Sequence, residues 1–208
     1  FYGSVLKHLE AHTDFHTEGV DLTGYEPPEA HFSIYLDNPA ENIISCTAYA
    51  RYGEETFSLA TPISCEDGFR DAAMENRILT AIQTYFQPAA VSGNEEPPVA
   101  DADFIISHDD QAAFLFLEQG LPHFYELAEV FISSNMKRIR ILSAPKTAVG
   151  VSVSKGLLEI DIQSDSLPYE ELAGILNSYR RRQKYYKLKS GEFLKLENNS
   201  LSVLSELA

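Results

Sequence analysis

The sequence predicts an α+β fold made of antiparallel β-hairpins and meanders with a few helices, arranged in two lobes. Three observations support this class: alternating apolar and polar side chains over residues 31–59, a second alternating pattern over residues 149–162, and helical apolar spacing over residues 69–86. Residues 88–103 are acidic and rich in proline, which is typical of a linker. We therefore expect one lobe on each side of this segment.

The first lobe is predicted over residues 31–87, after an irregular N-terminal segment at residues 1–30. Three strands with apolar side chains at every second position are expected, at residues 31–36, 43–52 and 56–59. Asp37-Asn38-Pro39 is the predicted turn between the first two. A long helix should follow, with Asp67 as its N-cap and Pro88 as its end.

The second lobe is predicted over residues 104–208. Its strands are expected at residues 104–107, 127–133, 139–142, 149–154, 157–162, 185–188 and 193–196. One helix should begin at His108-Asp109-Asp110 and end at Gly120. Another should begin between Ser166 and Glu170, carry an apolar stripe, and be followed by a short helix at residues 201–207. The stripe is Leu172, Ile175, Leu176 and Tyr179.

Composition excludes several classes of protein. The chain has 208 residues, of which 44% are hydrophobic and 23% charged, so it can bury a core. Its wholly apolar stretches, such as residues 112–117, are far shorter than the roughly 18–20 residues that cross a bilayer. No P-loop, dinucleotide-binding or nucleophile-elbow motif is present. We expect no membrane association, no catalytic residues and a cytoplasmic location.

The nucleophilic and metal-binding side chains form only weak patterns. Cys46 and Cys65 belong to no motif and indicate reduced thiols, although a single bridge is also compatible with them. His8, His12 and His16 would lie along one stripe of a helix, but their neighbours are poor helix formers. We interpret them as surface histidines and predict no metal site and no cofactor. A small hydrolase using histidines or carboxylates is the least favoured function.

Charge is strongly polarised along the chain. The formal net charge is −15, with 4 basic and 23 acidic residues in positions 1–136 but 12 basic and 8 acidic in positions 137–208. Phosphate binding needs a positive footprint, so the chain as a whole is not a nucleic-acid coat. The two halves should face different surroundings.

The strongest local feature is the basic and tyrosine-rich segment at residues 179–189. Its candidate site residues are Tyr179, Arg180, Arg181, Arg182, Lys184, Tyr185, Tyr186, Lys187 and Lys189. Such cations neutralise phosphates and such rings stack on bases, so direct nucleic-acid contact is one interpretation. Docking on an acidic protein domain is a second. The third is structural, with cations at a helix C-terminus and rings packed inward.

Several segments together resemble the bacterial Swi/Snf-type helicase-associated domain. They are Gln119-Gly120-Leu121-Pro122, residues 128–133, residues 149–160 and residues 178–194, with looser agreement at residues 50–54 and 77–86. The resemblance covers roughly residues 31–208 and is dense from residue 112 onward.

The resemblance implies an accessory, non-enzymatic domain that precedes a Swi/Snf-type ATPase motor in one polypeptide. ATP and Mg²⁺ would then belong to the absent motor, and the motor would be this domain's partner. Double-stranded nucleic acid would be a further partner of the full-length protein, in a bacterial cytoplasm or nucleoid. The resemblance supplies no catalytic residues and no zinc site. An independent nucleic-acid-binding module acting through residues 179–189 is the alternative.

Overall fold

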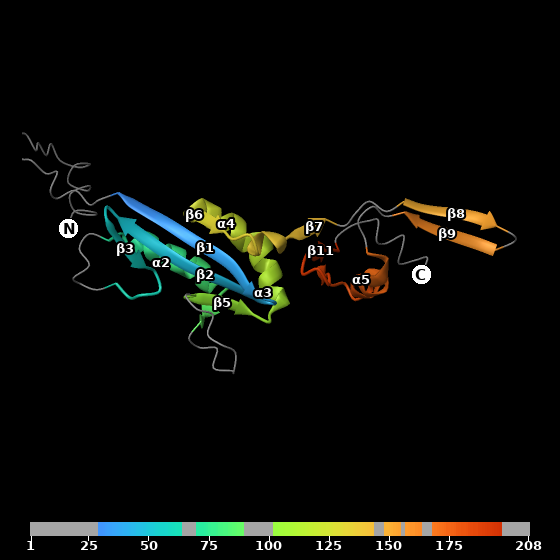
Figure 1. Cartoon of the computed structure of the whole chain (residues 1–208), viewed down its shortest axis with the longest axis horizontal. Coiled ribbons are helices and arrows are strands. Elements are labelled where there is room, and N and C mark those ends of the chain that lie inside the picture. The colour runs from blue at the N-terminus through green and yellow to red at the C-terminus, as the bar shows by residue number, and fades with distance from the viewer. Residues whose placement is uncertain are drawn as a thin grey trace, which may run out of the picture.

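The α+β class is confirmed by a computed structural model, which describes residues 29–63, 70–89, 102–143, 148–154, 157–163 and 168–196 (Figure 1). The first sheet has six strands in the order β4-β5-β2-β1-β6, with β3 also pairing with β2. These strands are β1 (Ala30–Ala40), β2 (Ile43–Tyr52), β3 (Glu55–Ser58), β4 (Gln87–Pro88), β5 (Phe104–Ser107) and β6 (Glu129–Ile132).

Two smaller sheets follow in the C-terminal part. One has the order β10-β11-β7 and consists of β7 (Ile141–Ser143), β10 (Tyr185–Lys187) and β11 (Phe193–Lys195). The other is the hairpin of β8 (Ala148–Ser154) and β9 (Leu157–Gln163). The strands expected at residues 149–154 and 157–162 form one hairpin, in which Ser154 pairs with Leu157, and those expected at residues 185–188 and 193–196 form another, in which Lys187 pairs with Phe193.

The predicted meander of the first three strands is confirmed, but its first turn is not. Strand β1 continues to Ala40 through a register shift, so Asp37-Asn38-Pro39 lies inside the strand. The Asn38 side-chain amide donates to the carbonyl oxygens of Ala40 and Ile43 and closes this irregularity. The chain reverses at Glu41-Asn42 instead, where Asn42 has φ +61°, a value that asparagine tolerates well.

The sheets are mixed, whereas the sequence predicted antiparallel pairing. Strand β6 runs parallel to β1, with Ser33 opposite Glu129 and Leu36 opposite Ile132. Strand β7 likewise runs parallel to β11. Residue periodicity reports which side chains face the core but not the direction of a neighbouring strand, so these parallel pairs were missed.

The first helix, α2 (Ala72–Gln83), begins later than predicted. Its N-cap is Asp71, whose carboxylate accepts the N–H of Met74 at 3.0 Å, and not Asp67. Asp67 lies outside the described residues. The position of the cap is explained by tertiary contact, because the hydroxyl of Tyr52 accepts the N–H of Asp71 at 2.8 Å and holds the helix start against the sheet.

The next helix does not end at Gly120. Helix α3 (Asp110–Leu115) begins at the predicted N-cap Asp109 and continues through the π-helical turn η4 (Phe116–Gly120) into α4 (Leu121–Leu127). A Cβ atom on Gly120 would lie 2.7 Å from the Phe116 ring and 2.8 Å from the Tyr85 ring. Glycine is therefore present to allow this close packing rather than to stop the helix.

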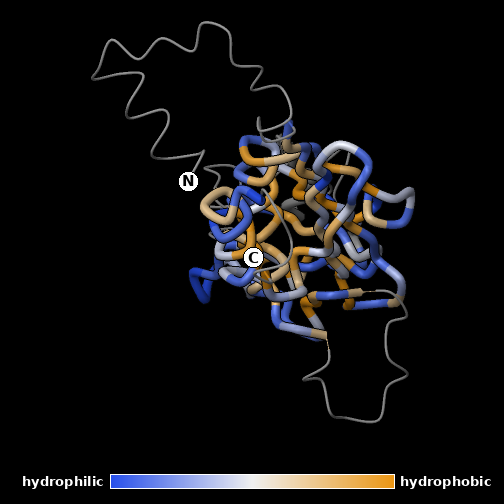
Figure 2. The backbone as a smooth tube through the Cα atoms, turned by 90° about the vertical axis from the view of Figure 1, so that its left-hand side faces the viewer, coloured by the Kyte–Doolittle hydropathy of each residue, from blue (hydrophilic) through white to orange (hydrophobic). Residues whose placement is uncertain are grey.

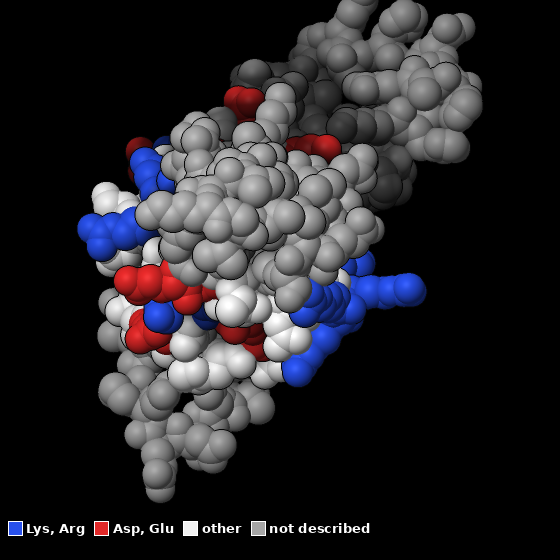
Figure 3. Space-filling view, turned by 90° about the vertical axis from the view of Figure 1, so that its right-hand side faces the viewer, with Lys and Arg blue, Asp and Glu red and all other residues white. Residues whose placement is uncertain are grey.

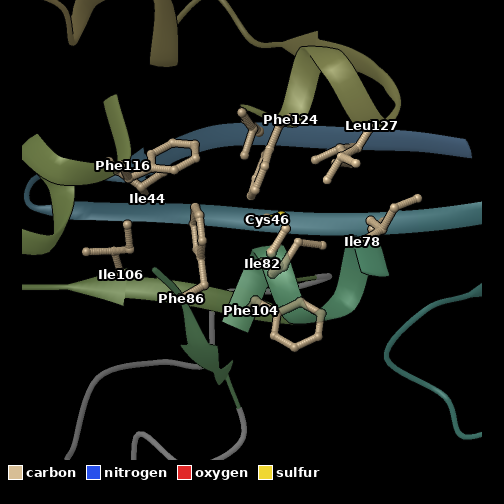
Figure 4. Close-up of a cluster of buried hydrophobic side chains, with 14 of the residues drawn as sticks. Ile44, Cys46, Ile78, Ile82, Phe86, Phe104, Ile106, Phe116, Phe124 and Leu127 are labelled. Carbon is tan, nitrogen blue, oxygen red and sulfur yellow. The ribbon is translucent and has the colours of Figure 1, made fainter. Parts of the chain in front are cut away.

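The helices and the large sheet enclose one hydrophobic core, which we call the core of the sheet body (β1–β6 with α2, α3, η4 and α4). Figure 4 shows side chains from α2, η4 and α4 directed toward those of β2 and β5. Ile34, Cys46, Phe116 and Phe124 have no exposed surface. Apolar segments gather inside the molecule and hydrophilic ones outside (Figure 2).

The packing does not divide at the predicted linker, residues 88–103. Strand β5, which follows this segment, pairs with β2, and β4 at its start pairs with β5. A second, smaller hydrophobic cluster occurs further along the chain and involves Ile175, Leu176, Leu188, Leu194 and Leu196. It belongs to what we call the C-terminal unit, formed by β7, β10, β11 and helix α5 (Leu172–Arg180).

Two single turns of 3-10 helix, η5 (Met136–Arg138) and η6 (Tyr169–Glu171), complete the described elements. The expected N-terminal segment and its histidines, the Ser166 start and the helix at residues 201–207 lie outside the described residues. Within the described part of the chain, no helix has the length and apolar character needed to cross a membrane.

Candidate interaction surface at the end of α5

Helix α5 ends inside the predicted site, in a motif that turns the chain through a left-handed residue. The N–H of Arg182 donates to the Tyr179 carbonyl oxygen at 2.8 Å, and the N–H of Gln183 donates to the Ser178 carbonyl oxygen at 3.1 Å. These are the two bonds of a Schellman C-cap. Arg182 has φ +57°, which costs less for glycine or asparagine. An arginine is thus kept where backbone energetics favour glycine.

The three tyrosines of the segment face inward. Tyr179 and Tyr186 pack against the cluster of the C-terminal unit, and Tyr185 packs against the core of the sheet body. The Tyr185 ring stacks on Phe114 with centroids 4.5 Å apart. Burial, followed by the charges of Asp110 and Asp109, raises the pKa of Tyr185. None of these rings is presented as a stacking platform for bases.

Lys187 is also committed to internal contacts. Its ammonium group binds the Asp110 carboxylate and the Asn42 side-chain carbonyl oxygen, and it lies 5.7 Å from the centre of the Phe193 ring. Lys195 on the neighbouring strand binds Glu118 at 2.7 Å. The basic hairpin β10–β11 is therefore partly neutralised by acidic residues of the sheet body.

Glu171 is a buried carboxylate that the sequence did not single out. Its two oxygens accept the N–H of Lys189 at 3.3 Å and 3.1 Å. Burial, and then the charge and a hydrogen bond of Glu171, raise the pKa of Tyr186. The sequence signal for this buried site was the pair of adjacent aromatic residues at positions 185 and 186. A strand that is buried on both faces has large side chains at consecutive positions.

A cleft of about 640 Å³ separates parts of the sheet body from the C-terminal unit. Its charged lining includes Arg138, Lys187 and Lys189, together with Asp110 and Glu171. The lining comes from segments far apart in the sequence, so no local pattern could have predicted it. With cations and carboxylates interleaved, the cleft has no single sign of charge to select a ligand.

The remaining cations of the segment point outward. We call Arg180, Arg181, Arg182 and Lys184 the arginine cluster; all four are exposed, and Lys189 is exposed beside the hairpin turn. Figure 3 shows one group of basic side chains along an edge of this end of the molecule, while on the opposite side of the view basic and acidic side chains lie next to each other. Of the nine predicted site residues, the structure thus presents the cations at the end of α5 and withdraws the tyrosines and Lys187.

The described residues contain neither a reactive thiol nor a cluster of metal-binding side chains. The Cys46 thiol is fully buried, and its burial, followed by the charge of Asp103, raises its pKa far above the ordinary value. A thiol held neutral in a core is a poor nucleophile. Within the described ranges, no group of three or more histidines, cysteines and carboxylates is arranged to hold a metal ion.

Comparison with known proteins adds one match. Residues 1–208 match the family model described as bacterial SNF2 helicase associated. No curated protein and no solved structure matches the chain significantly.

Proposed function

Because the chain belongs to the bacterial SNF2 helicase-associated family, we propose that it is a non-catalytic accessory domain that docks on a Swi/Snf-type ATPase motor of its own polypeptide and modulates it. The arginine cluster is the docking surface. The observation that supports this assignment is the outward orientation of four cations at the end of α5, next to tyrosines that face inward.

Arginine-rich docking fits an acidic protein surface. A guanidinium group binds a carboxylate through two parallel hydrogen bonds, and three such groups are consecutive in the cluster. Arg182 occupies a left-handed position that favours glycine, and non-glycine residues in such conformations cluster at functional sites. In this proposal ATP and Mg²⁺ act only at the motor, since this chain contains no P-loop.

A second candidate function uses the same cluster for phosphates of double-stranded nucleic acid. The short spacing of the four cations supports it, because phosphate contacts need positive charge and no base stacking. The inward tyrosines disfavour binding of single strands, which depends on stacking. Docking is preferred because the net charge of −15 opposes binding of the chain to the phosphates of nucleic acid.

The two candidates are separated in the full-length protein by Arg181→Glu/Lys184→Glu. The matched control is Arg77→Glu/Lys137→Glu, which changes the net charge equally at exposed positions on α2 and η5. Docking predicts altered ATPase activity with an unchanged salt dependence of duplex affinity. Phosphate contact predicts that the slope of log K against log salt falls by about one per lost contact. If neither quantity differs from the control, both functions of the cluster are rejected.

A further inference from the structure

Among the described elements, helices cover one face of the large sheet, and none of them covers the other face. In β1, Ile34 and Leu36 point into the core, so Ser33 and Tyr35 lie on the opposite face. The same alternation places Thr47, Tyr49 and Arg51 of β2 on that face. We call it the open sheet face.

The open sheet face carries aromatic side chains where a solvated face would be polar. Tyr35 is 44% exposed and Phe131 is 41% exposed. Their rings stack with centroids 4.8 Å apart and an interplanar angle of 12°. The Tyr49 ring meets the Tyr35 ring edge-on at 5.9 Å. Exposed aromatic clusters of this kind are typical of interaction surfaces.

Two shallow hollows flank this aromatic ridge. One, of about 440 Å³, is lined by residues that include Tyr49, Arg51 and Glu129. The other, of about 540 Å³, is lined by residues that include Ser45 and Thr47.

We infer that the open sheet face binds a second copy of this chain. The face has two different sides about β1, because β2 lies on one side of this strand and β6 on the other. We place two copies with their open sheet faces toward each other and relate them by a two-fold axis that runs parallel to β1, midway between the two sheets. In this arrangement β2 of each copy lies over β6 of the other. Sheets pack face to face with nearly aligned strands in this way, and such an interface is isologous.

Register and charge both fit that arrangement. Phe131 and Thr47 are level with Tyr35 on opposite sides of β1, so the large ring of one copy meets the small side chain of the other. Glu129 is level with Ser33 on the β6 side, and Arg51 is level with His31, two residue pairs further along, on the β2 side. Each copy thus offers an exposed cation and an exposed carboxylate that cross-pair with its partner.

The interface is small. Sixteen residues line the two hollows, fewer than the roughly 20–30 residues per side of a standard interface. The net charge of −15 on each copy adds repulsion, which salt near 0.15 M screens beyond about 8 Å. We therefore expect a weak dimer with a Kd on the order of micromolar or above.

The test is a charge swap in the 208-residue chain, followed by sedimentation equilibrium over a range of concentrations. Arg51→Glu alone and Glu129→Arg alone should each raise the Kd at least tenfold, because like charges then face each other. An equimolar mixture of the two variants should dimerise again, because every crossed pair has opposite charges. Arg77→Glu and Glu126→Arg, at exposed positions on α2 and α4, are the matched controls and should show no such rescue.

Circular dichroism checks that each variant is folded, and Phe131→Ser provides an independent disruption of the ridge. Dimerisation of the wild type, its loss in each single variant and its return in the mixture support the proposal. A wild type that stays monomeric at the highest concentration overturns the proposal. A dimer whose Kd is unchanged by both charge reversals also overturns it. Protection of β1 and β6 from hydrogen exchange only within the longer polypeptide would assign the face to another domain and also overturn it.

Discussion

The ion pair between Arg70 and Glu75 is the most informative site for a stability measurement. The two side chains meet at 2.6 Å and are only 3% and 4% exposed. The Tyr52 hydroxyl donates to the Glu75 carboxylate at 2.7 Å, and the Arg70 guanidinium lies 4.3 Å from the centre of the Phe57 ring. The network joins β2 and β3 to the start of α2.

Removing one partner should be costly because it leaves a buried, unpaired charge. We expect Arg70→Met to lower the free energy of unfolding by about 3–5 kcal/mol, the range measured when buried ion pairs are broken. Replacing both partners, as in Arg70→Met/Glu75→Leu, should recover most of that loss, because no charge then remains unpaired. The coupling energy from the double-mutant cycle should therefore be large.

The assay is urea denaturation of the wild type, both single variants and the double variant, followed by tyrosine fluorescence and circular dichroism. Coincident transitions by the two probes establish two-state behaviour. Asn76→Ala, an exposed position on the same helix, is the control for helix substitution. A loss below about 1 kcal/mol for Arg70→Met, or a double variant no more stable than the singles, would refute the reasoning from burial.

Three further predictions concern backbone and protonation. Arg182→Gly should stabilise the chain by about 1 kcal/mol in thermal denaturation, because the left-handed φ of +57° then carries no Cβ penalty; a lower Tm would contradict this. Gly120→Ala should destabilise by about 1–3 kcal/mol, although alanine normally favours helices, because its Cβ would meet the rings of Phe116 and Tyr85; a raised denaturation midpoint would exclude that steric argument. Burial, and then the hydrogen bond to Glu75, raise the pKa of Tyr52, so this residue contributes stability below its unfolded value of about 10 that is lost as pH rises toward the folded value. Tyr52→Phe should flatten the fall of stability above pH 10, and an identical alkaline profile would show that Tyr52 is not responsible.

The structure explains part of the charge difference between the two halves of the chain. Lys187 pairs with Asp110, and Lys195 pairs with Glu118. These two cations of the C-terminal half therefore bind the C-terminal unit to the acidic sheet body. The arginine cluster lies outside these pairs at the end of α5. It is therefore the part of the segment whose charge is directed at a partner in our proposal.

Much of the local structure was predictable because it depends on neighbours in the sequence. Alternation predicted β1 and β2, and the aspartate at position 109 predicted the start of α3. The turn of the last hairpin contains Gly191, whose φ of +90° suits glycine. The apolar stripe of α5 likewise predicted the side that meets the cluster of the C-terminal unit. Each depends on interactions within a few residues.

Only the tertiary structure decided where helices end, which side chains of the segment at residues 179–189 face inward, and which strands pair in parallel. Gly120 is a helix terminator by local rules, yet it lies within a helix because two rings pack against it. Tyr185 and Lys187 belong to a typical nucleic-acid-binding pattern, but contacts with Phe114 and Asp110 turn them inward. The parallel pairing of β6 with β1, which creates the aromatic ridge, joins residues about a hundred positions apart. Local sequence determines which conformations are available, and burial against distant partners selects among them.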